Sequence, residues 1–218
     1  FLVIMFLLMI VGIIYVEQGQ RRIPIQFAKR VRGRKVLGGQ SSYIPLKVNS
    51  AGVIPVIFAT SVLFFPALIA TSLPQDNNIT AAIRNWIDIN LANAQGTSWF
   101  YIFFLGMLII FFTYFYTTIQ FDPVRQSDMI RRQGGFIPGV RPGISTTNYL
   151  SHILSRITLP GSVFLASVAV LPSIASAIWD IPLGFSGISI LITVGVALET
   201  MKQVESQLSM RNYEGFID

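Results

Sequence analysis

Long apolar stretches alternate with polar segments along the chain, and their spacing predicts helices that cross a membrane. A helix that spans a hydrocarbon layer of ~30 Å needs about 20 apolar residues. The stretches that reach or approach this length are 1–16, 50–73, 99–119, 157–179 and 183–198. None of them contains Lys, Arg, Asp or Glu. The pattern predicts an all-α membrane protein, a polytopic helical bundle. Phe1 opens the chain inside an apolar run, so we expect a piece of a longer protein, cut within a membrane helix.

The polar segment 17–49 shows the periodicity of strands. Ile23, Ile25 and Phe27 alternate with polar neighbours, and a second extended stretch at 40–47 returns toward the membrane. Gly33 is available for a turn between them. We therefore expect a β-hairpin-like loop whose arms of about eight residues hold a cationic tip ~26 Å from the membrane.

Three interpretations of the hairpin tip stay open. Its basic residues include Arg32, Arg34 and Lys35. Anionic lipid attracts a basic residue by about 1 kcal/mol, but only within a Debye length of the membrane surface. Basic residues held farther out suit a large acidic partner, either a protein or the phosphates of ribosomal RNA. The third interpretation is a solvated loop whose charges only fix the topology.

The polar segment 120–156 predicts a short helix and then a stiff loop. Asp122 is a candidate N-cap with Pro123 at the first helical position, and the helix over 125–133 should stop at Gly134-Gly135. Two Pro-Gly pairs then flank Arg141, which stiffens the backbone on both sides of this side chain. A charge on a stiff loop has a fixed direction. Ser145 or Thr146 is expected to cap the next helix.

Helical periodicity predicts two further features, a surface helix and a helix–helix interface. Apolar residues recur at helical spacing over 77–91, which indicates a short amphipathic helix on the outer membrane surface, with a solvated loop as the alternative. Small residues recur along the fourth span and predict a helix–helix interface. They are Ser162, Ala166, Ala169, Ser173 and either Ser176 or Ala177.

Composition narrows the function. Apolar residues make up 52% of the 218 residues and charged residues only 12%, against roughly 25% charged in a soluble domain. A soluble globular enzyme is thereby excluded. Cysteine is absent and histidine occurs once, which leaves no disulfide framework, thiolate metal site or iron–sulfur cluster. No Walker-type loop appears, so we expect neither ATP hydrolysis nor any cofactor.

The charges sort by side of the membrane. All basic residues except Arg84 fall in the segments 17–49, 120–156 and 199–218. By the positive-inside rule these two loops and the C-terminal tail are cytoplasmic. The sequence therefore predicts a multi-pass protein whose connecting segment 74–98 lies outside.

Two longer motifs resemble one family. The runs Leu46-Lys-Val-Asn-Ser-Ala-Gly-Val-Ile-Pro-Val-Ile-Phe58 and Gly135-Phe-Ile-Pro-Gly-Val-Arg-Pro-Gly143 resemble signature segments of bacterial SecY, the central subunit of the protein-conducting channel. The resemblance covers the whole chain, 1–218, and corresponds to the C-terminal half, from the sixth to the tenth membrane helix. It implies an inner (plasma) membrane protein with two pseudo-symmetric halves around an hourglass pore.

The resemblance also implies roles for individual residues. Ile57 and Ile192 would contribute to a ring of aliphatic side chains at the waist of the pore, and an apolar constriction can block ions by dewetting. Ser61 and Phe65 share a helix face with Ile57 and would line a lateral gate toward lipid. Pro55 and Pro66 are expected to kink this helix.

The resemblance also implies binding partners. They are the SecE and SecG subunits, the SecA ATPase, a translating ribosome, the translocating polypeptide with its signal sequence, and membrane lipids. Arg141 matches an arginine central to coupling with SecA or the ribosome, and Arg32, Arg34 and Lys35 lie where further partner contacts are expected.

The sequence leaves two rival functions to consider. Half of an inverted-repeat secondary transporter stays the alternative, although such transporters usually need ionisable residues inside the membrane and these spans carry none. An intramembrane serine protease would pair His152 with a serine such as Ser162. Ten residues on one helix separate two side chains by ~15 Å, far beyond the ~3 Å that a nucleophile and its base need.

Overall fold

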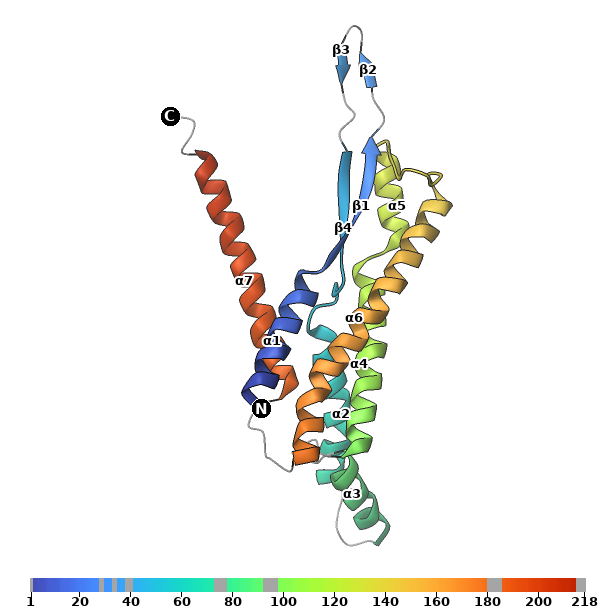
Figure 1. The fold of residues 1–218 in the computed structure, drawn as a ribbon. Coiled ribbons are helices and arrows are strands. Elements are labelled where there is room, and N and C mark those ends of the chain that lie inside the picture. Colours follow the sequence, from blue (N-terminus) through green and yellow to red (C-terminus); the bar gives the residue numbers. More distant parts are fainter. Residues whose placement is uncertain are drawn as a thin grey trace.

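The structure is a computed structural model that describes residues 2–27, 30–32, 35–37, 41–72, 78–91, 98–179 and 186–214. Helices dominate this part of the chain (Figure 1). They are α1 (Leu2–Gln18), α2 (Ile54–Ser72), α3 (Asn78–Asn90), α4 (Trp99–Gln120), α5 (Pro123–Arg132), α6 (Ile144–Trp179) and α7 (Gly187–Glu214). The strands are β1 (Gln20–Phe27), β2 (Arg30–Arg32), β3 (Lys35–Leu37), β4 (Ser41–Lys47) and β5 (Gly135–Phe136).

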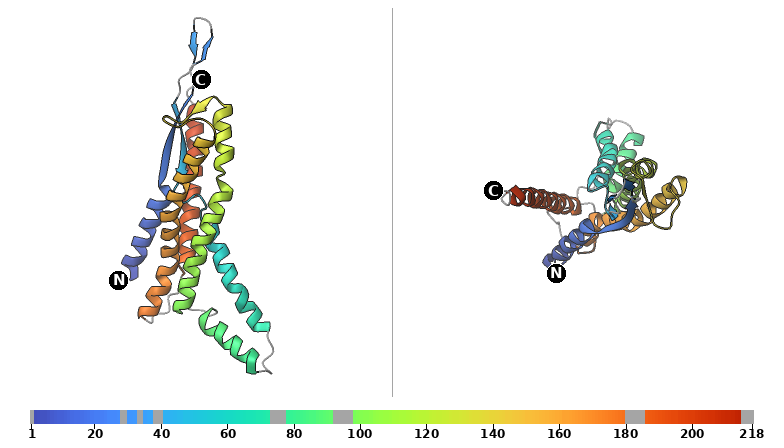
Figure 2. Two further views of the ribbon diagram at one scale, coloured as in Figure 1. Left: turned by 90° about the vertical axis from the view of Figure 1, so that its right-hand side faces the viewer. Right: turned by 90° about the horizontal axis from the view of Figure 1, so that it is seen from above.

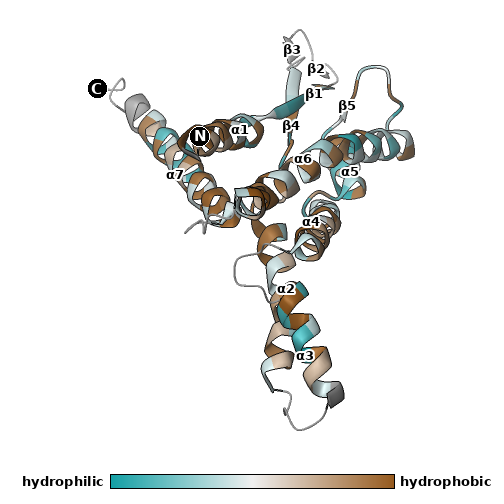
Figure 3. Ribbon diagram, turned by 60° about the horizontal axis from the view of Figure 1, so that its bottom comes forward, coloured by the Kyte–Doolittle hydropathy of each residue, from teal (hydrophilic) through white to brown (hydrophobic). Residues whose placement is uncertain are grey.

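Four helices in the described ranges are long and apolar enough to cross a membrane: α2, α4, α6 and α7. The predicted first span is the apolar helix α1, whose 17 residues reach only ~26 Å and fall short of a full crossing. α1, α4 and α7 run toward the hairpin end of the molecule, whereas α2 and α6 run away from it (Figure 1). Figure 3 shows hydrophilic colours on β1 and α5 and hydrophobic colours along the long helices.

Two helices continue beyond the predicted membrane spans. α6 continues for 36 residues without a break, although Pro160 and Pro172 lie inside it. Tertiary packing holds α6 together, since more than half of its apolar window is buried. α7 continues past the predicted end at 198 to Glu214, and its far half leans away from the other helices (Figure 2). The predicted start of this span at 183 lies outside the described residues.

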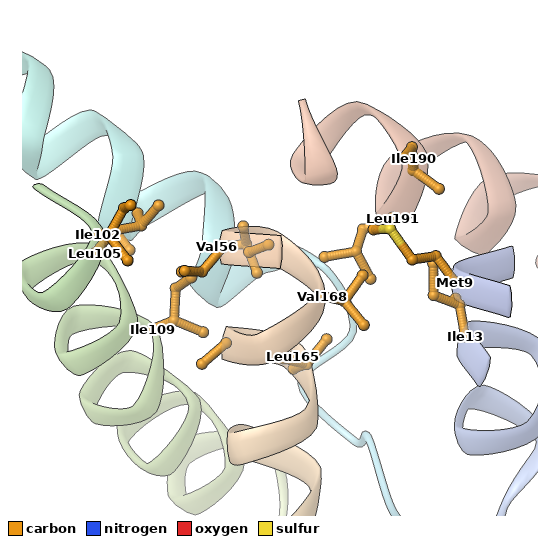
Figure 4. Close-up of a cluster of buried hydrophobic side chains, with 14 of the residues drawn as sticks. Met9, Ile13, Val56, Ile102, Leu105, Ile109, Leu165, Val168, Ile190 and Leu191 are labelled. Atoms are coloured by element: carbon orange, nitrogen blue, oxygen red, sulfur yellow. The ribbon is translucent and has the colours of Figure 1, made fainter. Parts of the chain in front are cut away.

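The main core gathers around α6 (Figure 4). Its buried members come from five helices and include Met9, Val56, Leu105, Leu165 and Leu191. The predicted small-residue interface on α6 is confirmed: Ser162, Ala166, Ala169 and Ser176 are buried, and Ser173 and Ala177 are half-buried. Small side chains let α4 and the other helices approach α6 closely.

Two glycines of the membrane helices allow backbone to approach backbone. A Cβ added to Gly161 of α6 would lie 2.6 Å from the carbonyl oxygen of Val48, in the segment that leads from β4 to α2. A Cβ on Gly187, the first residue of α7, would collide with the carbonyl oxygens of Val168 and Ala169. Any larger side chain at either position must displace an element, because a backbone oxygen cannot rotate away.

The predicted hairpin is confirmed and has more strands than expected. β1 and β4 pair antiparallel from Gln20↔Lys47 to Gln26↔Ser41, and β2 pairs with β3 farther out. β5 adds a third strand beside β1 through Gln26↔Phe136. The alternating residues Ile23 and Ile25 are buried, as the period-two pattern predicts. They form a second core with residues from β4, α5, α6 and the loop between the two helices: Leu46, Ile130, Ile137, Leu150 and Ile153.

Candidate functional site

The hairpin base, α5 and the start of α6 form one unit at one end of the molecule. Gly135 joins them, because a Cβ there would lie 3.0 Å from Ile25 Cγ2, 3.1 Å from Phe27 Cε1 and 3.2 Å from Ile130 Cγ2. The predicted N-cap of α5 is confirmed: Asp122 Oδ1 accepts from the backbone N–H of Val124 at 2.9 Å. The unit therefore gives the following loop a rigid support.

Arg141 lies on this supported loop. Gly139 and Gly143, which each follow a proline near Arg141, have φ of 82° and 111°, a region that favours glycine. The carbonyl oxygen of Arg141 accepts from the buried Thr146 hydroxyl at 3.0 Å. The carbonyl oxygen of Gly143 accepts from the Ser127 hydroxyl at 3.1 Å. The backbone on both sides is thus tied to α5 and α6, while the Arg141 side chain is exposed.

The predicted cap of α6 was wrong. Helix α6 begins at Ile144, so Ser145 and Thr146 lie inside its first turn. The carbonyl of Gly143 accepts from the backbone N–H of Thr146 and Thr147. The chain enters the helix at least two residues earlier than expected, at the positive φ of Gly143. The Thr146 hydroxyl therefore points back and donates to the carbonyl oxygen of Arg141.

The hairpin tip is described only in part. The backbone of Arg32 pairs with that of Lys35 across β2 and β3. Arg34 lies outside the described residues, and the side chains of 28–40 are not described. Other exposed arginines lie on β1, α5 and the first part of α6: Arg21, Arg22, Arg125, Arg131, Arg132 and Arg156. In the described part of the chain the only salt bridge joins Arg84 to Asp88, so these arginines have no acidic partner there.

The two predicted waist residues lie at one level of the bundle. α7 approaches the residue before α2 closely, since a Cβ on Gly195 would be 3.3 Å from Val53 Cγ2. Ile57 follows Val53 by one helical turn, and Ile192 precedes Gly195 by about one turn. Since α2 and α7 run in opposite directions, both isoleucines lie on the same side of this crossing. Their side chains are 46% and 37% exposed, so neither is buried in the core.

One face of α2 is packed and another is open. Val56, Ala59 and Leu63 are buried against α4 and α6, whereas Ser61 and Phe65 are exposed on the face that begins at Ile57. The Ser61 hydroxyl donates to the carbonyl of Ile57 at 2.8 Å, which satisfies it without a partner helix. The predicted kink at Pro55 was wrong, because Pro55 is the second residue of α2, where a missing N–H costs little. Pro66 does lie inside the helix.

Sequence reasoning missed a groove of about 780 Å³, lined by both polar and apolar residues, between α7 and the segment that leads into α2. Its charged and amide-bearing lining residues are Glu17, Lys47, Asn49, Gln120, Glu199, Lys202, Gln203 and Gln207. Asn49 is 4% exposed and donates from Nδ2 to Glu17 Oε2 at 2.9 Å, while its Oδ1 has no partner among the described residues. The available signal was Glu17, an acid in the last turn of a helix, where the helix dipole disfavours it.

The described residues offer no arrangement for hydrolysis or metal binding. Ser162 is fully buried and donates to the carbonyl of Leu159 at 2.8 Å, and His152 is exposed more than two turns earlier on the same helix. No group of three His, Cys, Asp or Glu that could hold a metal ion occurs in the described ranges.

The comparisons with known proteins all match one family. A family model described as SecY matches residues 1–201. The chain is 52% identical over 213 residues to the protein translocase subunit SecY of Streptomyces coelicolor, covering 97% of this chain and 47% of that protein. It is 48% identical over 219 residues to the protein of the same name from Mycobacterium tuberculosis, covering 97% and 49%. The chain thus spans about half the length of the curated relatives it matches.

Solved structures agree on the fold. A structure described as that of a protein conducting channel aligns with a TM-score of 0.58 at 17% identity, over 94% of this chain and 48% of that one. A structure concerned with the plug domain of the SecY protein aligns with a TM-score of 0.56 at 16% identity, over 94% and 49%. The helical bundle with its small sheet is therefore shared with these proteins.

Proposed function

The chain belongs to the SecY family, and from this membership we propose that it forms one half of a channel that passes unfolded secretory polypeptides across a membrane. The observation that carries the proposal is the position of Ile57 and Ile192. These two exposed aliphatic side chains lie at one level beside the crossing of α2 and α7. An apolar constriction of this kind excludes ions by dewetting and yields when a chain is pushed through it.

The surfaces on either side of this level suit such a passage. The groove toward the hairpin end is lined by amides and by two acids and two lysines, Glu17, Glu199, Lys47 and Lys202. Two acids and two lysines balance in charge, so this mixed lining does not favour one charge type on a passing chain. The open face of α2 from Ile57 to Ile69 is mostly apolar, with Ser61 as its exposed polar residue, which fits lateral release of signal sequences and membrane helices into lipid.

The energy that moves the polypeptide has to come from outside the spans. The five predicted spans contain no Lys, Arg, Asp or Glu, so they offer no charged group that could couple transport to an ion gradient. We infer that the hairpin end faces the cytoplasm and docks SecA or a ribosome through Arg141, Arg32, Arg34 and Lys35. Arg141 and the exposed arginines of β1, α5 and α6 give an acidic partner an attractive surface. SecE and SecG are the expected partners within the membrane.

A crosslinking experiment tests the passage. The chain has no cysteine, so Ile57→Cys and Ile192→Cys are unique reporters here, once any cysteine elsewhere in the complete protein is replaced. A secretory polypeptide carrying one cysteine and arrested during transport should form a disulfide with both. Phe111→Cys, on an exposed face of α4, is the matched control and should remain unlinked. Equal linkage at all three positions, or at Phe111→Cys alone, would contradict the proposal.

A further inference from the structure

Helix α3 carries an apolar ridge that stays largely exposed among the described residues. It connects the span α2 with the span α4 and packs against both of them. Ile83, Trp86 and Ile89 are 47%, 52% and 65% exposed. Their spacing of three residues places them along one side of the helix. The Arg84–Asp88 ion pair, 3.7 Å long, lies away from this ridge.

The ridge is continuous with the exposed aromatic face of α4. The ring of Trp86 meets Phe100 edge-on at 5.6 Å, and Phe100 stacks on Phe104 at 5.7 Å. Phe100 and Phe104 are themselves exposed, as is the neighbouring Phe103. α4 is long and apolar enough to cross a membrane, and an exposed aromatic face on such a helix suits lipid surroundings. The same surroundings therefore extend from this face onto the α3 ridge.

We propose that α3 is a membrane-surface anchor whose Ile83, Trp86 and Ile89 ridge enters the interfacial layer of a phospholipid bilayer at the end opposite to the hairpin. With 13 residues α3 is ~20 Å long, too short to cross the hydrocarbon and suited to lying in the interface. Indole rings prefer the headgroup level, and Trp86 stands in the middle of the ridge. Because α3 packs against α2 and α4, the anchor fixes the ends of both spans in one leaflet.

Tryptophan fluorescence of the complete complex in phosphatidylcholine vesicles tests this. Trp99 and Trp179 and any tryptophan elsewhere are replaced by Phe, which leaves Trp86 as the reporter. Lipid brominated on the upper part of its acyl chains should quench Trp86 about twofold, and aqueous acrylamide should quench it weakly. The matched control combines Trp86→Phe with Asp88→Trp, about 200° around the helix, and should show the reverse order.

A second reporter avoids the tryptophan substitutions. A nitroxide attached to Ile89→Cys should collide more often with dissolved oxygen, which concentrates in lipid, than with a water-soluble nickel chelate. Greater access to the chelate, or stronger quenching of Trp86 by acrylamide than by brominated lipid, would overturn the proposal. Weak access to both reagents would also overturn it, because the ridge would then be covered by protein.

Discussion

Arg141→Glu is expected to reduce SecA-driven export more than tenfold while the channel still inserts into the membrane. The side chain is exposed, so its charge contributes little to the fold. Its backbone is held by the Thr146 hydroxyl and by the glycines on either side, so the side chain starts from a fixed point on the loop. Loss of one partner of a docked charge pair costs about 2–5 kcal/mol, and about 1.4 kcal/mol is already a factor of ten.

Matched variants separate an aimed contact from general attraction. Arg132→Glu removes the same charge at the same end of the molecule, from an exposed position at the end of α5. It should reduce export only slightly, and Arg141→Lys should fall between Arg141→Glu and the unmodified protein because lysine lacks the planar fork. The measurement is the rate at which a precursor becomes protected from protease in inverted vesicles. Normal export by Arg141→Glu would contradict the role of this loop.

Ile192→Asn is the second change with a large expected effect. Ile192 is 37% exposed beside the crossing of α2 and α7, so a polar side chain there need not disturb the core. An amide at an apolar constriction holds water and removes the dewetting barrier. Ion conductance through the resting channel in a planar bilayer should rise about tenfold. Precursors with defective signal sequences should then be exported more readily.

Val196→Asn is the control for this change. It lies one turn along α7, is 60% exposed, and already faces the groove, so water is present there without the substitution. Its conductance should match that of the unmodified channel. If Ile192→Asn left both the conductance and the export of defective precursors unchanged, Ile192 would not belong to the constriction.

Local patterns predicted the elements well. The apolar stretch at 99–119 and the helix α4 differ by one residue, because the helix has no charge or proline to interrupt it. The alternation of Ile23, Ile25 and Phe27 predicted which face of β1 is buried. Asp122 and Pro123 predicted the start of α5, because a side-chain cap depends only on neighbouring residues.

Contacts between distant segments were beyond the sequence. Gly161 and Gly187 look like ordinary small residues until Val48 and Val168 are seen against them. The third strand β5 has only two residues, too few for any periodicity. The bond between Asn49 and Glu17 joins residues 32 positions apart, and nothing local to either residue predicts it. Such features depend on how helices pack, and a single sequence does not predict that packing.

Part of the candidate site could likewise be predicted from the sequence and part could not. The two Pro-Gly pairs around Arg141 made its stiff loop predictable from composition alone, and the structure adds the two hydroxyls that tie it down. Ile57 and Ile192 could not be distinguished from the other isoleucines by composition. Only the family resemblance singled them out, and their shared level at the Val53–Gly195 crossing is a fact of three-dimensional packing.

The central claim is that these helices wall a passive passage and that docked machinery moves the polypeptide. The most direct measurement uses the purified complete complex in sealed vesicles, with a fluorescent secretory precursor, a panel of small solutes and an imposed proton or sodium gradient. We predict that the precursor enters only when SecA and ATP are supplied on the hairpin side, and that no solute accumulates. Solute accumulation driven by the ion gradient without any motor would contradict the claim and favour a secondary transporter.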